Sequence, residues 1–387
     1  MSSRRLEAIV ERAVTDRAFP SACLLLAKDG GEPVVHRAFG RARLDSVFDL
    51  ASLTKPLATT ACLMRLAAAG QLDVASPLMS IIPSARRYPV GKATIAELLA
   101  HASGLPAWHP YYEETAVLSP RAARRRVRQA ILSDDLEARP GEKSIYSDLG
   151  FILLGWALER LTGTRLDRLM AREVSSPLGL RSTTFVDLEA PLATRPLLPF
   201  IPTERCPRRG RLLGEVHDDN THALGGIAGH AGLFSTAFEV HLLVRELVAA
   251  WAGERSLFDR DVVRAFWAAR PAREARGRVD GRALGWDRPS ADGRSSAGRL
   301  ISPLAVGHLG FTGTSVWIDL ERRAWLIFLT NRVYYGRERN PMKALRPRVH
   351  DAAWRLLAKR RSASPLEASR DFAAERELTP AILRDRR

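Results

Sequence analysis

Residues 50–70 read LASLTKPLATTACLMRLAAAG. The stretch is mostly apolar and stops at Gly70, so it predicts a helix that begins near Ser52. On such a helix Ser52 and Lys55 lie side by side, because residues three apart face the same way. A neutral amine beside a hydroxyl group accepts its proton, which makes this pair a candidate nucleophile and base.

Lys55 stands out because only six of the 59 basic residues are lysines. Its sequence neighbours Leu53 and Leu57 are apolar, and a lysine kept among arginines indicates that a small, deprotonable head group matters there. The positive end of a helix disfavours a second positive charge in the first turn, which favours a neutral amine. The alternative interpretation is a serine near a helix cap beside a solvated lysine.

Two later segments carry polar groups that suit the same chemistry. Tyr146, Ser147 and Asp148 directly precede an apolar helical stretch at 149–161. Tyr146 is a candidate proton shuttle, although the serine and the aspartate are also typical of a helix cap. Further on, residues 308–314 read HLGFTGT. Closely spaced glycines at the start of a strand let a substrate approach the backbone, where an N–H group would complete an oxyanion hole; the alternative is a plain turn into a hairpin.

Together these motifs resemble the serine β-lactamase and penicillin-binding-protein family, in its branch of class C-like hydrolases and esterases. That branch carries S-x-x-K, then Y-x-N, then K-T-G or H-x-G. The counterparts in this chain are residues 52–55, 146–148 and 308–310. Three further segments also look familiar: 94–105, 225–236 and 328–332. The resemblance extends over most of the sequence.

The resemblance implies a role for each motif residue. Ser52 would attack a carbonyl group and form an acyl-enzyme that water then hydrolyses. Lys55 and Tyr146 would share the proton transfers, and the N–H groups of Ser52 and Phe311 would form the oxyanion hole. The other motif positions would contact the substrate: Asp148, His308 and Gly310.

Two positions depart from the family pattern. His308 stands where β-lactamases and cell-wall peptidases usually have a lysine that holds a substrate carboxylate. Histidine is mostly neutral at pH 7, which favours esters or amides without an essential carboxylate. Asp148 stands in place of asparagine. If it faces Lys55 it would favour the charged amine and leave Tyr146 as the better base, whereas a carboxylate that only caps the helix would leave the usual roles unchanged.

The order of the expected elements predicts a sheet with strands from both ends of the chain and a helical lobe inserted between them. With the resemblance, this implies an α/β (α+β), β-lactamase-like fold, in which helices flank an antiparallel sheet. The expected strands are 21–27, 33–39, 314–318 and 324–330. The expected helices are 3–16, 52–69, 94–102, 149–161, 166–174 and 342–359, and one that opens at Ser119-Pro120. The expected domains are a discontinuous sheet domain (1–75 and 225–360), the inserted lobe (76–224) and a tail (361–387).

Composition limits the other function classes. The net charge of +16 would suit nucleic acid, but no nucleic-acid module accompanies it, so we expect no such partner. The N-terminus lacks an apolar signal segment, and no early apolar run could span a membrane, so we expect a cytoplasmic protein without a membrane partner. The three cysteines suit free, buried thiols. No cofactor or metal is expected, because the histidines and aspartates near Asp218 match no zinc spacing.

The leading hypothesis is therefore an esterase or related acyl hydrolase that acts on a small-molecule ester, amide or lactam. A peptidase or amidase on cell-wall fragments is an alternative, as is a β-lactamase, which His308 and the missing export signal disfavour. A non-catalytic scaffold is disfavoured because Ser52, Lys55 and Tyr146 are all intact. The oligomeric state stays open, as does whether Trp108 lines the cleft or packs inside.

Overall fold

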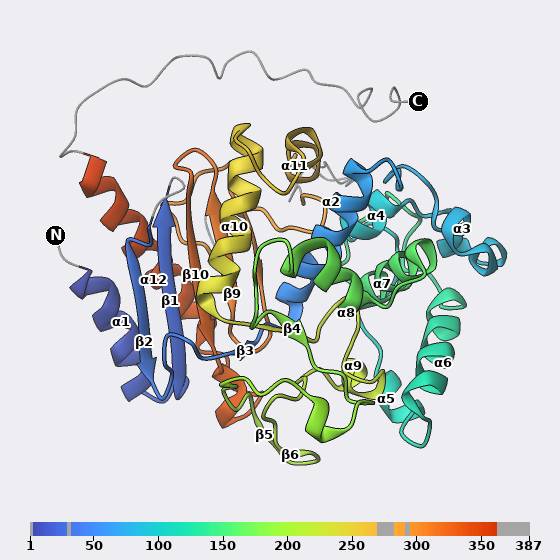
Figure 1. The fold of residues 1–387 in the computed structure, drawn as a ribbon, viewed down its shortest axis with the longest axis horizontal. Helices are drawn as coiled ribbons and strands as arrows, with labels where there is room; N and C mark the ends of the chain where they lie inside the picture. Colours follow the sequence, from blue (N-terminus) through green and yellow to red (C-terminus); the bar gives the residue numbers. More distant parts are fainter. Residues whose placement is uncertain (1–2, 29–31, 269–281, 291–294, 362–387) are drawn as a thin grey trace.

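A five-stranded sheet with the order β2-β1-β10-β9-β8 combines strands from both ends of the chain (Figure 1). All of its neighbouring strands pair in antiparallel fashion. The strands are β1 (Ser21–Lys28), β2 (Val35–Gly40), β8 (Val306–Leu309), β9 (Ser315–Asp319) and β10 (Ala324–Thr330). The computed structural model describes residues 3–28, 32–268, 282–290 and 295–361.

The central strands β1 and β10 are apolar along nearly their whole length, so both faces of the sheet are covered. Side chains of a strand alternate between its faces. Leu24 and Phe328 belong to one core cluster, whereas Leu25 and Ile327 belong to the other. Register pairs Leu25 with Ile327 across the two strands. The sheet thus separates two hydrophobic cores.

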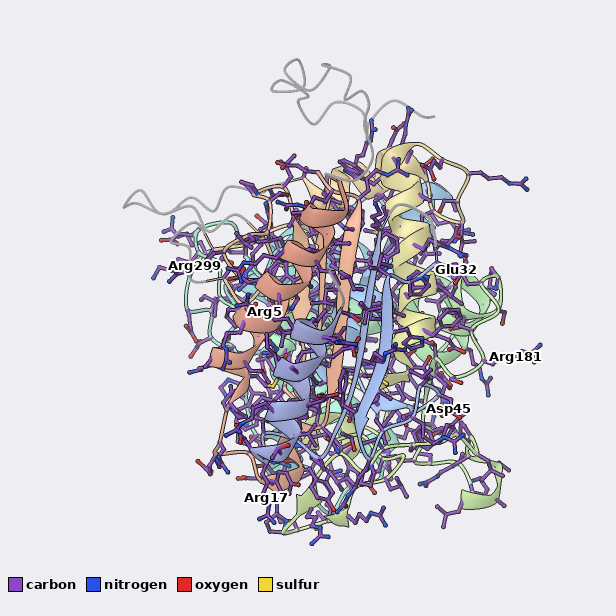
Figure 2. The ribbon with its side chains drawn as sticks, turned by 90° about the vertical axis from the view of Figure 1, so that its left-hand side faces the viewer. Arg5, Arg17, Glu32, Asp45, Arg181 and Arg299 are labelled. Carbon is purple, nitrogen blue, oxygen red and sulfur yellow. The ribbon has the colours of Figure 1, made fainter. Side chains whose placement is uncertain are left out.

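Helices cover the two faces of this sheet. The helices α1 (Arg4–Thr15) and α12 (Met342–Arg361) lie along one face, and α10 (Ala237–Ala252) lies along the other (Figures 1 and 2). Arg181, labelled at the right of Figure 2, is exposed at the edge of the molecule, where water solvates its charge.

Helices and short strands fill the middle of the chain. The further α-helices are α2 (Ala61–Ala68), α3 (Leu78–Ile81), α4 (Ile95–Leu99), α5 (Tyr111–Glu114), α6 (Pro120–Leu132), α7 (Asp148–Thr162), α8 (Leu166–Met170), α9 (Asp219–Ala223) and α11 (Arg260–Trp267). A second sheet has the order β3-β7-β4, formed by β3 (Phe48–Asp49), β7 (Leu233–Ser235) and β4 (Thr184–Phe185). A small ribbon pairs β5 (Arg205–Cys206) with β6 (Gly210–Arg211).

These elements confirm the expected fold class and refine its boundaries. The helix expected at 52–69 consists of a 3₁₀ turn (Ala51–Leu53), a π-helical turn (Lys55–Thr60) and α2. The helix expected at 94–102 is shorter, because α4 ends at Leu99. The 16-residue helix α10 was missed, although Thr236 caps its start. The three cysteines are free and buried, as expected. The domain limits remain a prediction, and nearly all of the tail at 361–387 lies outside the described residues.

In the described part of the chain, no helix combines the length and the apolar character that crossing a bilayer requires.

His350, on α12, provides a test of the packing on the outer face. It is fully buried, and neither ring nitrogen has a hydrogen-bond partner among the described residues. Burial, followed by the charge of Arg346, lowers the pKa of His350 to about 3. In the unfolded chain the pKa of His350 returns to about 6.5. Below that pH the unfolded chain therefore binds a proton at His350 that the folded protein does not bind. Stability is then lost as the pH falls toward the folded pKa.

We predict that His350→Met removes this acid sensitivity. The wild-type histidine should cost about 2 kcal/mol of unfolding free energy between pH 7 and pH 5. Urea unfolding of both proteins at the two pH values measures the difference, which isolates His350 from the other histidines. An equal loss in the variant would show that the folded protein protonates this residue normally.

Candidate active site

Ser52 lies on the tight turn that joins β3 to α2. Ala51, just before it, adopts a left-handed conformation with φ of 49°. The buried carboxylate of Asp49 stabilises this turn, because Oδ1 accepts the Ala51 N–H at 2.8 Å and Oδ2 accepts the His217 N–H at 2.7 Å. Pro56 is accommodated because it stands in the first turn of its helix.

Lys55 is completely buried directly beneath Ser52. Its Nζ donates to Ser52 Oγ at 3.0 Å, to Asp148 Oδ1 at 2.6 Å and to the His230 carbonyl at 3.3 Å. Three acceptors thus surround the amine, and an ammonium group can satisfy all three. Ser52 and Lys55 are thus in contact, as the sequence predicts, and Asp148 joins them as a third group.

The protonation of Lys55 follows from these contacts. Burial alone would lower its pKa, but the charge of Asp148 and the interactions with Tyr146 outweigh it, so the pKa of Lys55 is raised. The resting amine is therefore charged. Of the two protonation states that the sequence left open, the contact with Asp148 favours the charged amine, because the helix dipole is weaker than a carboxylate in direct contact.

Asp148 faces the site rather than only capping a helix. Ser147 is the N-cap of α7, and its side chain accepts the Gly150 N–H at 3.3 Å. The carboxylate of Asp148, at the first helical position, is thereby left to pair with Lys55. Of the two alternatives that the sequence left open, the structure supports the carboxylate that faces Lys55.

Tyr146 lies over the same amine, with its ring centroid 4.9 Å from Lys55 Nζ. Burial raises the pKa of Tyr146, and the charge of Lys55 with hydrogen bonds from Lys55 and Ser52 only partly offsets it, so the phenol stays protonated. The buried His101 positions this tyrosine: its ring packs 4.5 Å from Tyr146, and its Nδ1 accepts the Ser147 N–H at 3.0 Å. The sequence marked His101 only as part of a familiar segment.

His308 lies on the edge strand β8, with its ring 5.9 Å from that of Tyr146. Its Nδ1 contacts the Leu309 carbonyl at 2.9 Å, so Nδ1 carries the hydrogen. Burial, opposed by Asp287 and reinforced by Lys55, lowers the pKa of His308 to about 4. The imidazole is therefore neutral at pH 7, and its Nε2 has no hydrogen-bond partner within the part of the chain that the structure describes.

Gly310 and Phe311 follow β8 and pack against the strand end that leads into Ser52. A Cβ at Gly310 would lie 2.6 Å from the Leu50 carbonyl oxygen, so only glycine fits there. Thr312 Oγ1 donates to the Asp49 carbonyl at 2.8 Å, and Thr314 Oγ1 donates to the Leu50 carbonyl at 3.1 Å. The turn 310–314 is thus tied to the backbone of the Ser52 turn.

Two residues near Lys55, Asp218 and His230, were not predicted from the sequence to lie at the site. Asp218 and His230 pair at 2.9 Å, and their ligand atoms lie within 4.8 Å of a carboxylate oxygen of Asp148. Their spacing matches no zinc pattern, and their proximity arises only from folding. A metal ion there would meet the ammonium of Lys55, which already neutralises Asp148.

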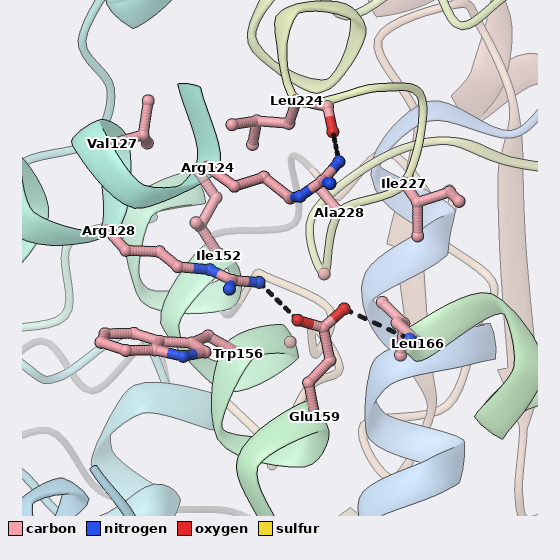
Figure 3. Close-up of a pocket in the computed structure, with 12 residues that line it drawn as sticks. Arg124, Val127, Arg128, Ile152, Trp156, Glu159, Leu166, Leu224, Ile227 and Ala228 are labelled. Atoms are coloured by element: carbon pink, nitrogen blue, oxygen red, sulfur yellow. Dashed lines mark hydrogen bonds and ion pairs between the residues drawn. The ribbon is translucent and has the colours of Figure 1, made fainter. Parts of the chain in front are cut away.

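A small cavity behind the site is closed to substrate. Its volume is about 20 Å³, room for about one water molecule. Figure 3 shows the ion pair between Arg128 and Glu159 across it, and the bond from Arg124 to the Leu224 carbonyl. This cavity is therefore too small to hold a substrate.

Comparison with known proteins accords with this geometry. The sequence profile of the Beta-lactamase family matches residues 6–350. A Salmonella typhi protein named "Putative D-alanyl-D-alanine carboxypeptidase" is 30% identical over 366 residues, which cover 85% of this chain and 82% of the relative. These matches confirm the resemblance inferred from the motifs.

Solved structures share the fold at lower identity. Simvastatin synthase (LovD) from Aspergillus terreus has a TM-score of 0.68 and 21% identity, covering 91% of this chain and 98% of that chain. EstCE1, described as a hydrolase with promiscuous acyltransferase activity, has a TM-score of 0.67 and 19% identity, with coverage of 91% and 98%.

Proposed function

The chain belongs to the Beta-lactamase family, whose members act through a serine acyl-enzyme, and on this premise we propose that it is an esterase-type acyl hydrolase with Ser52 as the nucleophile. The observation that carries the proposal is the contact of 3.0 Å between Ser52 Oγ and the buried amine of Lys55. A scaffold protein would have no use for a buried ammonium, which is costly to desolvate. The same pair in an enzyme moves a proton.

We infer that Lys55 and Asp148 act as one base. Because the resting amine is charged, it gives a proton to Asp148 as it takes the proton of the Ser52 hydroxyl. Ser52 Oγ then bonds to the substrate carbonyl carbon, and the electron pair of the C=O bond moves to oxygen. The C–O bond to the alcohol breaks next as the C=O bond re-forms: Tyr146 gives its proton to the leaving alcohol and takes one from Lys55, which recovers a proton from Asp148. Water repeats the sequence to release the acid.

In this scheme Asp148 receives a proton and does not contact the substrate. We predict that Asp148→Asn lowers kcat/KM at pH 7 by about 10²-fold or more, because the amide cannot take the proton of the Lys55 ammonium. The variant depends on the neutral amine of Lys55 alone, so its kcat/KM should rise with pH where that of the wild type is flat. The measurement is p-nitrophenyl butyrate hydrolysis between pH 5 and pH 10, with the exposed Asp135→Asn as control. An unchanged kcat/KM across this pH range would exclude the pair of Lys55 and Asp148 as the base.

The surroundings of Ser52 favour esters with apolar groups. His308 is neutral at pH 7 and does not supply a cation for a substrate carboxylate. Two aromatic side chains flank the approach and stay accessible: Phe311 is 51% exposed and Trp108, next to the residue that binds the Asp148 N–H, is 45% exposed.

We predict that a fluorophosphonate probe labels Ser52 and that p-nitrophenyl butyrate is turned over faster than nitrocefin. Peptide mass mapping locates the adduct, and Ser52→Ala is the control that should lose both the label and the turnover. The absence of an adduct on Ser52 would refute the nucleophile. Faster turnover of nitrocefin would overturn the preference for esters and support a β-lactamase.

A peptidase for D-alanyl peptides is the second candidate, because of Arg282. Its guanidinium lies 5.5 Å from the Tyr146 ring, and its Nε donates to Ser144 Oγ at 3.1 Å. It also pairs with Asp287, whose backbone bridges to Gly307 next to His308. Although Asp287 balances its charge, the Arg282 guanidinium has further N–H groups that would donate to a peptide carboxylate at the mouth of the site. The name of the Salmonella typhi relative suits this candidate.

We predict that, if peptides are substrates, Arg282→Met raises KM for a D-alanyl-D-alanine peptide about tenfold or more, since a charge-assisted hydrogen bond is lost. Arg282→Lys, which keeps the charge, should recover part of the affinity. Release of D-alanine measures the reaction. Equal effects of both variants, or no release by the wild type, would reject the peptidase.

A further inference from the structure

The turn 310–314, which follows β8, has its carbonyl groups bound from behind. The Gly310 carbonyl accepts from Arg346 Nη2 at 3.1 Å and from the Gly313 N–H at 3.0 Å. The Thr314 carbonyl accepts from the same Arg346 Nη2 at 2.9 Å and from the Gly310 N–H at 2.8 Å. One guanidinium nitrogen on α12 therefore holds both ends of the turn.

A second arginine holds the middle of the same turn. Arg332 Nε donates to the Phe311 carbonyl at 2.8 Å, and the Arg332 N–H donates to the Thr312 carbonyl at 2.9 Å. The guanidinium also lies 4.5 Å from the centre of the Phe311 ring. The carbonyl side of the turn is thereby held at four of its five residues, 310, 311, 312 and 314.

Both arginines are buried, with 7% exposure for Arg346 and 4% for Arg332. Within the described part of the chain neither pairs with a carboxylate; carbonyl groups are their acceptors. Arg346 Nε has no partner at all there. Burying a cation without a counter-ion costs free energy. Packing alone does not explain such an arrangement, because an apolar side chain of similar size would fill the space.

The peptide plane explains what the arrangement achieves. In a trans peptide the C=O and the following N–H point in opposite directions. Since the Gly310 carbonyl is held toward α12, the N–H of Phe311 must point away from α12. Gly310 itself packs against the Leu50 carbonyl, two residues before Ser52. No protein acceptor takes the Phe311 N–H among the described residues.

We propose that Arg346 is a positioning residue for the oxyanion hole, and that it orients and polarises the peptide whose N–H belongs to Phe311. A charged donor on the carbonyl strengthens the opposite N–H as a donor, because hydrogen bonds in a chain polarise one another. The benefit appears only when negative charge develops on the substrate oxygen. The proposal rests on the acyl-enzyme function proposed above and adds a residue that touches neither substrate nor nucleophile.

The test compares Arg346→Met, Arg346→Lys and Arg346→Gln with the wild type, using p-nitrophenyl butyrate. Loss of one oxyanion donor costs about 10²–10³ in kcat, and weakening it through Arg346→Met should cost at least about tenfold. KM should change less than about threefold, because the ground-state carbonyl carries little charge. Arg346→Lys should recover most of kcat, and Arg346→Gln, a neutral donor, should fall between Lys and Met.

Phenylboronic acid is the second readout, because its tetrahedral adduct places a hydroxyl where the oxyanion forms. Its inhibition constant should rise by the same factor as kcat falls. Arg348→Met, an exposed arginine on the same helix, is the control for charge and helix stability. If circular dichroism shows that Arg346→Met does not fold, the test is the comparison of kcat and boronate affinity between Arg346→Lys and Arg346→Gln. Folded Gln and Lys variants with equal kcat and equal boronate affinity would overturn the proposal.

Fluorophosphonate labelling distinguishes a failure of this proposal from a failure of the proposal that Ser52 is the nucleophile. Label on Ser52 in the wild type with unchanged boronate affinity in the Arg346 variants rejects only the role of Arg346. No label on Ser52 in the wild type rejects the nucleophile, and the role of Arg346 is rejected with it.

Discussion

The buried ammonium of Lys55 is the constraint around which the site is organised. A cation without water needs acceptors, and three segments far apart in sequence supply them: the Ser52 turn, the start of α7 and the loop at His230. The strongest is the carboxylate of Asp148 at 2.6 Å. Moving any one of these segments would leave an unpaired charge inside the protein, so the position of α7 and the position of Ser52 are coupled.

The sheet explains how a fourth segment reaches the same point. Because β8 and β9 enter from the C-terminal part of the chain, the turn 310–314 arrives at the end of β3 from the opposite side. Thr312 and Thr314 bond to the carbonyls of Asp49 and Leu50, and Arg346 binds the other side of the turn. Rigid elements thus hold the turn on both sides, which is what preorganised donors require.

The sequence carried enough local information to predict the strands at 21–27 and 324–330, the helix before Gly163 and the family. Apolar runs and caps act over a few residues, so these features are readable. The pairing of Asp148 with Lys55 was left open, because it depends on whether Ser147 or Asp148 caps α7, a matter of side-chain direction. Nothing in the sequence distinguishes Arg346 from the other arginines, because only its contacts in the folded protein set it apart.

Charge placement gives the site its chemical character. Asp148 neutralises Lys55, His308 is uncharged at pH 7, and Asp287 neutralises Arg282. The groups that face a substrate therefore carry little net charge, so long-range attraction to an anion is weak. Arg332 and Arg346, which have no carboxylate partner among the described residues, instead lie behind a peptide group, where they act on a substrate only as its carbonyl oxygen becomes negative. A site of this kind discriminates by the transition state more than by the charge of the ground-state substrate.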